Sequence, residues 1–351
     1  MKKVLIDLLK LDNLFVGLGQ VSLNYGKTIA EWALNNPNTF QFYFLVPQKF
    51  IGFFGNHINY KTTSDFSRYF SFSNSGFDLW HAIHQDSAYL PDHKTKYIVT
   101  IHDLNFMHEK AAAKANRRLN RLQKKVNRAA AVTCISNFAK AEVEAHLQLP
   151  QTCSVIYNGV QQLTYVDGTL PELIQLNKPF LFCICNISAK KNLHVLVPMM
   201  KYLPEMQLIL AGNAEGEYAE NLKAEINRSQ LNNIKLIGKI SDSEKAACMH
   251  QCAALAFPSL HEGFGLPVIE AMSCGKPVFL SSSSSLPEIA GAFGYYWNSF
   301  EPNEMATLIN AQMEKERTNV ELTFARQQYA KQFDWNHNVE SYMRLYKQVL
   351  H

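Results

Sequence analysis

Short apolar segments, rich in β-branched and aromatic residues, alternate along the whole chain with segments whose apolar positions lie three and four residues apart. The first pattern predicts strands that are buried on both faces, and the second predicts helices with one buried face. In the first half we expect strands at residues 4–9, 41–46, 79–81, 97–102, 132–136 and 154–157. In the second half we expect them at residues 180–185, 207–211, 234–237, 254–258, 278–281 and 295–297.

This alternation of strand and helix indicates parallel, doubly wound sheets of the α/β class. Two such series in a chain of 351 residues indicate two Rossmann-like domains. The linker is expected within 161–178, a segment with turn-forming residues and little periodicity. We therefore place a first domain at 1–165 and a second at 166–335. A last helix is expected at 336–351, and folds of this kind often return it to the first domain.

The most informative segment is 257–277, FPSLHEGFGLPVIEAMSCGKP. Gly263 and Gly265 permit a tight loop and the close approach of a ligand to the backbone, and Pro267 suits the first turn of a helix. Gly275 can cap the end of that helix, and Pro277 prevents its continuation. The pattern predicts a strand, a glycine-containing loop and a helix N-terminus, which is where phosphate binds in open α/β sheets.

Two carboxylates flank this loop. Glu270 is expected in the first turn of the helix, where the helix dipole favours an acidic side chain by about 0.3–1 kcal/mol. There it can accept hydrogen bonds from ribose hydroxyls, whereas Glu262 precedes the loop and would lie nearer a transferred group. A lone acidic residue at a helix start is usually a surface carboxylate. A second one eight positions earlier makes an anion-binding site the better interpretation.

The same residues resemble a family signature. E-G-F-G-L-P-x-x-E, from Glu262 to Glu270, is similar to the E-x7-E motif of the retaining family 4 glycosyltransferases, also called glycosyl transferases group 1, which have the GT-B fold. The resemblance extends to the segments 157–160 (YNGV), 191–193 (KNL) and 286–291 (LPEIAG). It implies two Rossmann-like domains that face a central cleft. It also implies transfer of a hexosyl group from a nucleoside diphosphate sugar with retention of configuration.

The family's residue roles carry over to matching positions. The resemblance implies that Glu270 binds the ribose, that Glu262 contacts the transferred sugar, and that Lys191 neutralises the departing diphosphate. Backbone amides would hold sugar hydroxyls and phosphate at Gly263, Phe264, Gly265 and Leu266. Family members often carry an arginine where this chain has Asn186, so either Lys190 compensates or the diphosphate is held less tightly. These groups replace a metal, so no metal and no cofactor are expected.

Candidate residues of the first domain follow its strands. His102 ends the strand at 97–102 and resembles the family's H-D step, which implies a hydrogen bond to the donor sugar. Asp103 is a candidate on the acceptor side. His81 and His84 follow an earlier strand and either line the acceptor side or lie on the surface.

Gly17-Leu18-Gly19 follows the first strand and nearly completes the dinucleotide-binding pattern G-x-G-x-x-G, but Ser22 occupies the third glycine position. The resemblance instead implies a loop that closes over the donor phosphate, with Gly19 approaching the sugar. A nicotinamide-dependent Rossmann oxidoreductase is therefore the alternative enzyme, and a non-catalytic, glycosyltransferase-like partner subunit is the alternative without activity.

A basic run occupies residues 110–128, with an apolar stripe at helical spacing. Its cations are Lys110, Lys114, Arg117, Arg118, Arg121, Lys124, Lys125 and Arg128. Such a helix either presents a solvated face or holds the protein at an anionic bilayer. A net charge of only +4 and a pI of about 8.5 do not favour nucleic acid as the partner.

Composition limits the remaining choices. With 47% hydrophobic and 18% charged residues, the chain reads as a soluble globular protein. Its seven cysteines are odd in number and have no CxxC spacing, which predicts small buried thiols in a reducing compartment. We therefore expect a cytoplasmic protein, held at the inner face of the membrane if the basic helix binds lipid. A UDP- or GDP-sugar donor and a glycan or lipid-linked glycan acceptor, as in cell-surface polysaccharide or lipopolysaccharide synthesis, are the expected substrates. The base, the sugar and the oligomeric state stay open.

Overall fold

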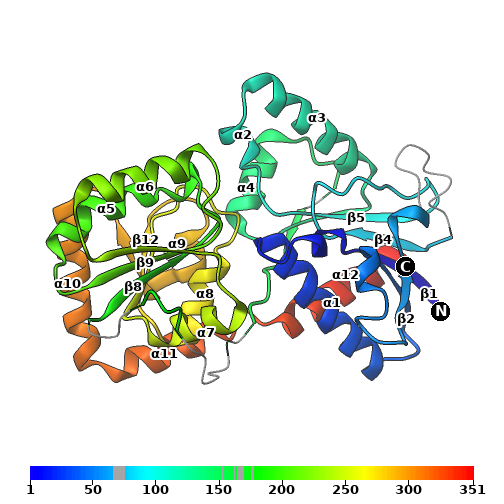
Figure 1. Ribbon diagram of the computed structural model, residues 1–351. Coiled ribbons are helices and arrows are strands. Elements are labelled where there is room, and N and C mark those ends of the chain that lie inside the picture. The colour runs from blue at the N-terminus through cyan, green and yellow to red at the C-terminus, as the bar shows by residue number, and fades with distance from the viewer. Residues whose placement is uncertain (66–75, 152, 162, 164–169, 175–177) are drawn as a thin grey trace. The chain divides into compact units, whose positions relative to one another are not determined.

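The computed structural model describes residues 1–65, 76–151, 153–161, 163, 170–174 and 178–351. The chain forms two compact units (Figure 1), which are unit 1 (Met1–Gln161 and Phe333–His351) and unit 2 (Gln162–Gln332). The predicted linker at 161–178 and the predicted boundary at 165/166 fall largely on residues outside the described ones. Each unit is described here by itself.

Unit 1 is built on a parallel sheet with the strand order β3-β2-β1-β4-β5-β6-β7. The strands are β1 (Lys2–Asp7), β2 (Phe40–Leu45), β3 (Asn59–Lys61), β4 (Leu79–Ala82), β5 (Lys96–Ile101), β6 (Ala131–Cys134) and β7 (Cys153–Val155). The six strands predicted for this half are confirmed. The edge strand β3 was not predicted, because its three half-buried residues contain no apolar run.

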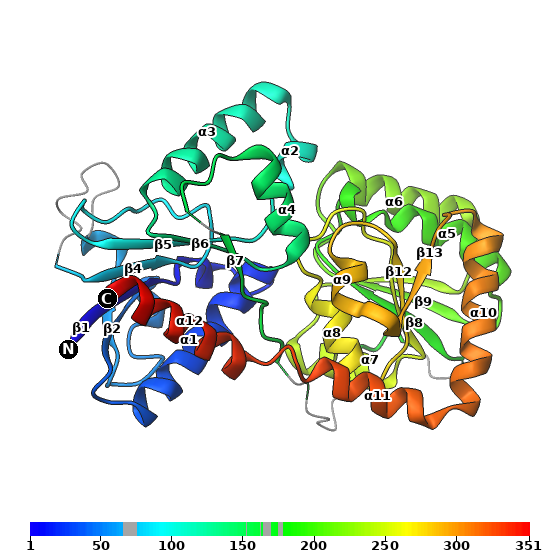
Figure 2. The same ribbon diagram turned by 180° about the vertical axis from the view of Figure 1, so that it is seen from behind.

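Helices cover both faces of this sheet. They are α1 (Gly17–Asn35), α2 (Phe106–Glu109), α3 (Ala112–Arg128), α4 (Asn137–His146) and α12 (Trp335–Leu350). In Figures 1 and 2, α1 and α12 lie side by side against one face, and α3 and α4 lie over the other. Leu122 and Val126 of α3 join Val99 and Val132 of the sheet in one hydrophobic core, so the basic helix is anchored by its narrow apolar stripe.

A buried polar network fastens α12, the last helix, to unit 1. The Tyr346 hydroxyl lies 2.8 Å from the Tyr25 hydroxyl of α1 and 2.6 Å from Nδ1 of His81 on β4. Nε2 of His81 lies 2.8 Å from the Thr100 hydroxyl of β5, which in turn lies 3.0 Å from the Tyr342 hydroxyl. Since these polar groups satisfy one another away from water, they fix one position of α12 on the sheet.

Unit 2 has a parallel sheet with the strand order β10-β9-β8-β11-β12-β13. The strands are β8 (Phe180–Ile184), β9 (Gln207–Ala211), β10 (Ile234–Gly238), β11 (Ala254–Phe257), β12 (Val278–Ser281) and β13 (Gly294–Trp297). All six strands predicted for this half are confirmed. The helices are α5 (Leu196–Met199), α6 (Glu217–Ser229), α7 (Asp242–Gln251), α8 (Leu266–Ser273), α9 (Leu286–Ala290), α10 (Pro302–Thr318) and α11 (Val320–Ala330).

The helices of unit 2 also cover both faces, with α5 and α6 on one side and α7, α8 and α11 on the other (Figures 1 and 2). The two sheets therefore confirm the doubly wound α/β prediction. Six of the seven cysteines are buried, Cys185 is half-buried and all are unpaired, as predicted. In the described part of the chain, no helix combines the length and apolarity needed to cross a bilayer.

Within unit 1, the start of α12 packs closely on Gly159. A Cβ atom at this position would lie 2.4 Å from the ring and 2.5 Å from the Cα of Trp335, the first residue of α12. We predict that Gly159→Ala lowers the free energy of unfolding of unit 1 by about 1–3 kcal/mol, the usual cost of overpacking. Urea denaturation followed by tryptophan fluorescence measures this change, and an unaltered unfolding midpoint would contradict the close packing.

Candidate functional site

Two strand ends of unit 2 come together through their following loops. The loop after β8 forms a short 3-10 helix, Ala189–Lys191, and the loop after β11 leads to α8. The carbonyl of Lys190 accepts hydrogen bonds from the Leu260 N–H (2.8 Å) and the Ser259 hydroxyl (3.2 Å). Because β8 and β11 are neighbours in a parallel sheet, both loops leave from the same edge.

Lys191 and Glu262 meet at this edge as an ion pair. Their side chains are only 12% and 13% exposed, and the Lys191 Nζ atom lies 5.1 Å from the centre of the Phe257 ring. Burial disfavours the charged lysine, but the adjacent Glu262 carboxylate outweighs it, so the pKa of Lys191 is raised. The structure thus brings together two of the residues assigned to catalysis.

A run of serines supports the loop that carries Glu262. The Ser285 hydroxyl donates to the carbonyls of Glu262 and Phe264, at 3.0 Å each, and the Glu262 N–H donates to the Ser284 hydroxyl at 3.0 Å. Ser281 donates to the carbonyl of Ser259. Sequence reasoning missed these residues, because 281–285 has the composition of an ordinary low-complexity loop.

The glycine loop and α8 follow the predicted pattern with one correction. Gly265 has a φ of 105°, in the left-handed region that favours glycine, and is the N-cap of α8. Its N–H and that of Leu266 find no acceptor among the residues that the structure describes. Glu270, however, is the fifth residue of α8 and lies in the second turn rather than the first, because the helix already begins at Leu266, one residue before Pro267.

The other end of α8 is held as predicted. Gly275 has a φ of 74°, its N–H donates to the Met272 carbonyl, and the Lys276 N–H donates to the Ala271 carbonyl, at 2.9 Å each. This pair of bonds is the Schellman motif. The buried Arg326 donates to the Gly275 carbonyl at 2.8 Å, so α8 is fixed at both ends.

Glu270 has an ionic partner that the sequence did not reveal. Lys245 of α7 donates from Nζ to Glu270 Oε1 at 2.8 Å, and the two side chains are 14% and 12% exposed. Burial disfavours the charge on Lys245, but Glu270 outweighs it and raises the pKa of the lysine. The two residues are 25 positions apart on different helices, so no spacing rule connects them.

The remaining candidates of unit 2 differ in exposure. Gly263 and Phe264 are buried within the supported loop. Asn186 is exposed beyond the end of β8, and Lys190 is half-buried in the 3-10 helix. Asn186 supplies no charge at the position where family members often carry an arginine. Lys190, four residues later, is the cation that could replace it.

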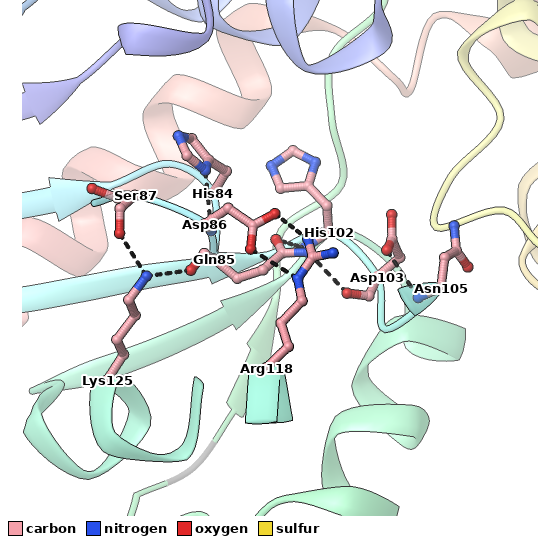
Figure 3. A network of polar contacts seen from close by, with 9 residues as sticks. All are labelled: His84, Gln85, Asp86, Ser87, His102, Asp103, Asn105, Arg118 and Lys125. Atoms are coloured by element: carbon pink, nitrogen blue, oxygen red, sulfur yellow. Dashed lines mark hydrogen bonds and ion pairs between the residues drawn. The ribbon is translucent and has the colours of Figure 1, made fainter. Parts of the chain in front are cut away.

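In unit 1, His102 belongs to a polar network at the ends of β4 and β5 (Figure 3). Gln85 lies at its centre, where it accepts from the His102 N–H at 3.0 Å and donates to the Asp103 carbonyl at 2.9 Å. Asp103 itself accepts from the Asn105 N–H at 3.0 Å. Gln85 therefore fixes the backbone of the His102-Asp103 step, a role that the sequence did not indicate.

The His102 ring has a defined tautomer. Nε2 lies 2.7 Å from the carbonyl of Ile83 and must donate to it, so Nδ1 of the neutral ring can only accept. Burial lowers the pKa of His102 to about 4, against a smaller opposing effect of the Ile83 hydrogen bond. His102 is therefore a neutral group with an acceptor nitrogen that has no partner among the described residues.

His81 and His84 correct the sequence expectations. His81 is fully buried and both ring nitrogens bind the α12 network, so it lies in the core rather than on an acceptor side or the surface. His84 is buried as well, and its Nδ1 accepts from the Asp86 N–H at 3.1 Å. The sequence placed them at a strand end correctly but could not show that α12 covers His81.

Gly17 and Gly19 also need a correction. They do not form a loop but lie in the first turn of α1. A Cβ atom at position 19 would lie 1.9 Å from the carbonyl oxygen of Asn13, so glycine is required there by the chain's own backbone.

The basic run divides into two sets. Three side chains bind groups within unit 1, namely Arg118, Lys125 and Arg128. Figure 3 shows Arg118 on Asp86 and Lys125 on the carbonyls of Gln85 and Ser87. The other five are exposed: Lys110, Lys114, Arg117, Arg121 and Lys124. The solvated face is thus smaller than the sequence suggested.

Across the described ranges, no three His, Cys, Asp or Glu side chains gather as metal ligands do.

Two family models match the chain, and both describe glycosyltransferases. Residues 171–332 match the family model "Glycosyl transferases group 1", and residues 34–162 match the model "Glycosyltransferase Family 4".

Individual relatives are distant. An uncharacterized glycosyltransferase of Methanocaldococcus jannaschii is 25% identical over 62% of this chain and 59% of its own length, which is less than two thirds of that protein. O-antigen chain mannosyltransferase B of Escherichia coli is 23% identical over 75% of this chain and 73% of its own length. Anabaena HepE, solved in complex with UDP and glucose, superposes with a TM-score of 0.73 at 20% identity, over 99% of this chain and 100% of HepE.

The two parallel-sheet units, together with these matches, define a glycosyltransferase of the GT-B fold. The chain belongs to the glycosyl transferases group 1, or family 4, whose two models match its two halves.

The buried histidines of unit 1 predict a pH-dependent stability. Burial lowers the pKa of His81 to about 3 and that of His102 to about 4, below the value of about 6.5 in an unfolded chain. The unfolded state then binds more protons, so stability is complete above about pH 6.5 and is lost as the pH falls. At pH 5 each histidine should lower the free energy of unfolding by about 2 kcal/mol.

Urea titrations at pH 7 and pH 5 test this effect, since three of the four tryptophans (Trp32, Trp80 and Trp335) report on unit 1. His81→Gln should remove about 2 kcal/mol of the difference between the two pH values. His93→Gln, at an exposed position, is the matched control. An unchanged difference in the His81 variant would contradict the neutral, buried state of this ring.

Proposed function

We propose that the chain is a retaining, metal-independent hexosyltransferase that uses a UDP- or GDP-sugar and a glycan or lipid-linked glycan acceptor. The observation that carries the proposal is the largely buried ion pair of Lys191 and Glu262 at the carboxyl ends of β8 and β11. Glu262 is four residues before the start of α8. A lysine there can neutralise the negative charge of a diphosphate, and the N–H groups of Gly265 and Leu266 can donate hydrogen bonds to the diphosphate oxygens.

Nucleotide recognition is assigned to Glu270. Its side chain is 12% exposed, and its carboxylate can accept hydrogen bonds from ribose hydroxyls. The UDP complexes of HepE support a nucleoside diphosphate as the ligand of such a fold, and the O-antigen mannosyltransferase supports a polysaccharide acceptor.

The reaction breaks the bond between the anomeric carbon and the diphosphate oxygen and forms a bond from that carbon to the acceptor hydroxyl oxygen. The acceptor proton passes to the departing diphosphate on the same face, which retains the configuration. Lys191 stabilises the negative charge of the leaving group. His102 orients the donor sugar by accepting a hydrogen bond from a sugar hydroxyl at Nδ1, in keeping with its neutral form.

Lys191→Met tests this assignment. Loss of the cation should reduce turnover of the preferred nucleotide sugar by roughly 30- to 1,000-fold, or about 2–4 kcal/mol in transition-state stabilisation. The measurement is release of UDP or GDP from a panel of nucleotide sugars. Lys201→Met, at an exposed position of unit 2, is the control. Turnover near that of the wild type in Lys191→Met would remove Lys191 from the mechanism.

The oxidoreductase alternative gives a different binding pattern. Thermal denaturation with UDP, GDP or NAD should show stabilisation by a nucleoside diphosphate and none by NAD. Stabilisation by NAD alone would favour a dinucleotide site in place of the proposed one.

A peripheral membrane attachment is proposed for the five exposed cations of the basic run. Each basic group near an anionic surface contributes up to about 1 kcal/mol, which suits an enzyme whose acceptor is attached to a lipid. Arg118 is left out of this surface because it pairs with Asp86.

Charge reversal separates this attachment from a merely solvated face. The triple variant Arg117→Glu, Arg121→Glu and Lys124→Glu should lose its affinity for vesicles that contain phosphatidylglycerol. A control variant that reverses Lys201, Lys315 and Lys331, all exposed on unit 2, changes the net charge equally and should keep binding. Equal vesicle affinity of the two variants in co-sedimentation would exclude attachment through this helix.

A further inference from the structure

We propose that Lys245 is a positioning residue of the donor site, whose ammonium group holds the Glu270 carboxylate in one orientation for ribose recognition. The inference rests on the proposed function, because it concerns how Glu270 binds a nucleoside diphosphate sugar. Neither the sequence motifs nor the family resemblance pointed to this lysine.

The backbone of Lys245 is fixed by the start of α7. Ser241 and Glu244 form a reciprocal capping box, with the Glu244 N–H donating to the Ser241 hydroxyl at 3.2 Å and the Ser241 N–H donating to Glu244 Oε2 at 2.8 Å. Lys245 follows at once, and its own N–H donates to the Ser241 carbonyl at 2.9 Å. The lysine therefore extends toward α8 from a rigid first turn.

The pair is largely removed from water. Lys245 Nζ lies 2.8 Å from Glu270 Oε1, and the exposed fractions of the two side chains are 14% and 12%. Breaking such a pair leaves a buried charge without compensation, which is far more costly than breaking a surface ion pair. The position of the Glu270 carboxylate therefore depends on Lys245.

The two carboxylate oxygens have different surroundings. Oε1 accepts from Lys245, whereas Oε2 has no hydrogen-bond partner among the described residues. One oxygen is thus held by the protein, and the other is left to accept from a ribose hydroxyl. A glutamate anchored in this way loses little conformational freedom when the nucleotide binds.

Removal of Lys245 should alter nucleotide binding in a manner that a purely structural role would not. Without the cation, the Glu270 carboxylate loses the hydrogen bond that fixes its Oε1 atom. The affinity for nucleotide should therefore fall only where a carboxylate is present at position 270, whereas a general loss of stability would weaken binding in either background.

A double-mutant cycle tests the proposal with UDP and GDP as probes. Calorimetric titrations of the wild type, Lys245→Met, Glu270→Gln and the double variant give the dissociation constants. We expect Lys245→Met to weaken binding by about tenfold. In the Glu270→Gln background the same substitution should change affinity by less than about twofold, since no carboxylate is left to position.

Two further variants keep the test decisive. Lys245→Arg retains a cation and should bind nucleotide nearly as well as the wild type, while the double variant removes both buried charges and so guards against misfolding of Lys245→Met. Lys201→Met is the matched surface control.

The outcomes separate this inference from the proposed function. If the wild type binds neither UDP nor GDP, both are overturned. If Glu270→Gln weakens binding and Lys245→Met does not, only the positioning role is wrong. An equal effect of Lys245→Met with and without Glu270 would also overturn it, because the lysine would then contact the nucleotide directly.

Discussion

A carboxylate is costly to take out of water unless a cation or hydrogen-bond donors compensate it, and unit 2 uses a lysine for this purpose twice within one loop and helix. Glu262 is paired with Lys191 and Glu270 with Lys245. Neighbouring residues hold both pairs in place. A serine hydroxyl supports the loop that carries Glu262, and Arg326 fixes the C-terminal end of α8, the helix that carries Glu270. Charges that are preorganised in this way can stabilise a diphosphate and a ribose without further rearrangement.

Unit 1 differs from unit 2, because burial there keeps histidine rings neutral instead of pairing charged groups. His81 is used entirely within the core, where it ties α12 to the sheet through tyrosine and threonine hydroxyls. His102 differs because only one ring nitrogen is occupied. The same residue type thus has a structural role at the end of one strand and a candidate binding role at the end of the next.

The sequence predicted those features that are encoded locally. Buried strands appear as apolar runs, and Gly265, Pro267 and Gly275 mark the two ends of α8 through their backbone preferences. Features that depend on distant segments were missed or misplaced. Lys245 reaches Glu270 from another helix, and His81 is covered by a helix more than 250 residues later. Glu270 lies in the second turn of α8 rather than in the predicted first turn, because the helix begins one residue before Pro267.

We infer that unit 2 holds a nucleoside diphosphate between Lys191 and Glu270, and a crystal structure of the protein with UDP or GDP would locate this ligand. Ribose hydroxyls should lie within hydrogen-bond distance of Glu270, and the diphosphate should lie at Lys191 and the N-terminus of α8. A nucleotide bound at the start of α1, or one in unit 2 that contacts neither residue, would contradict it.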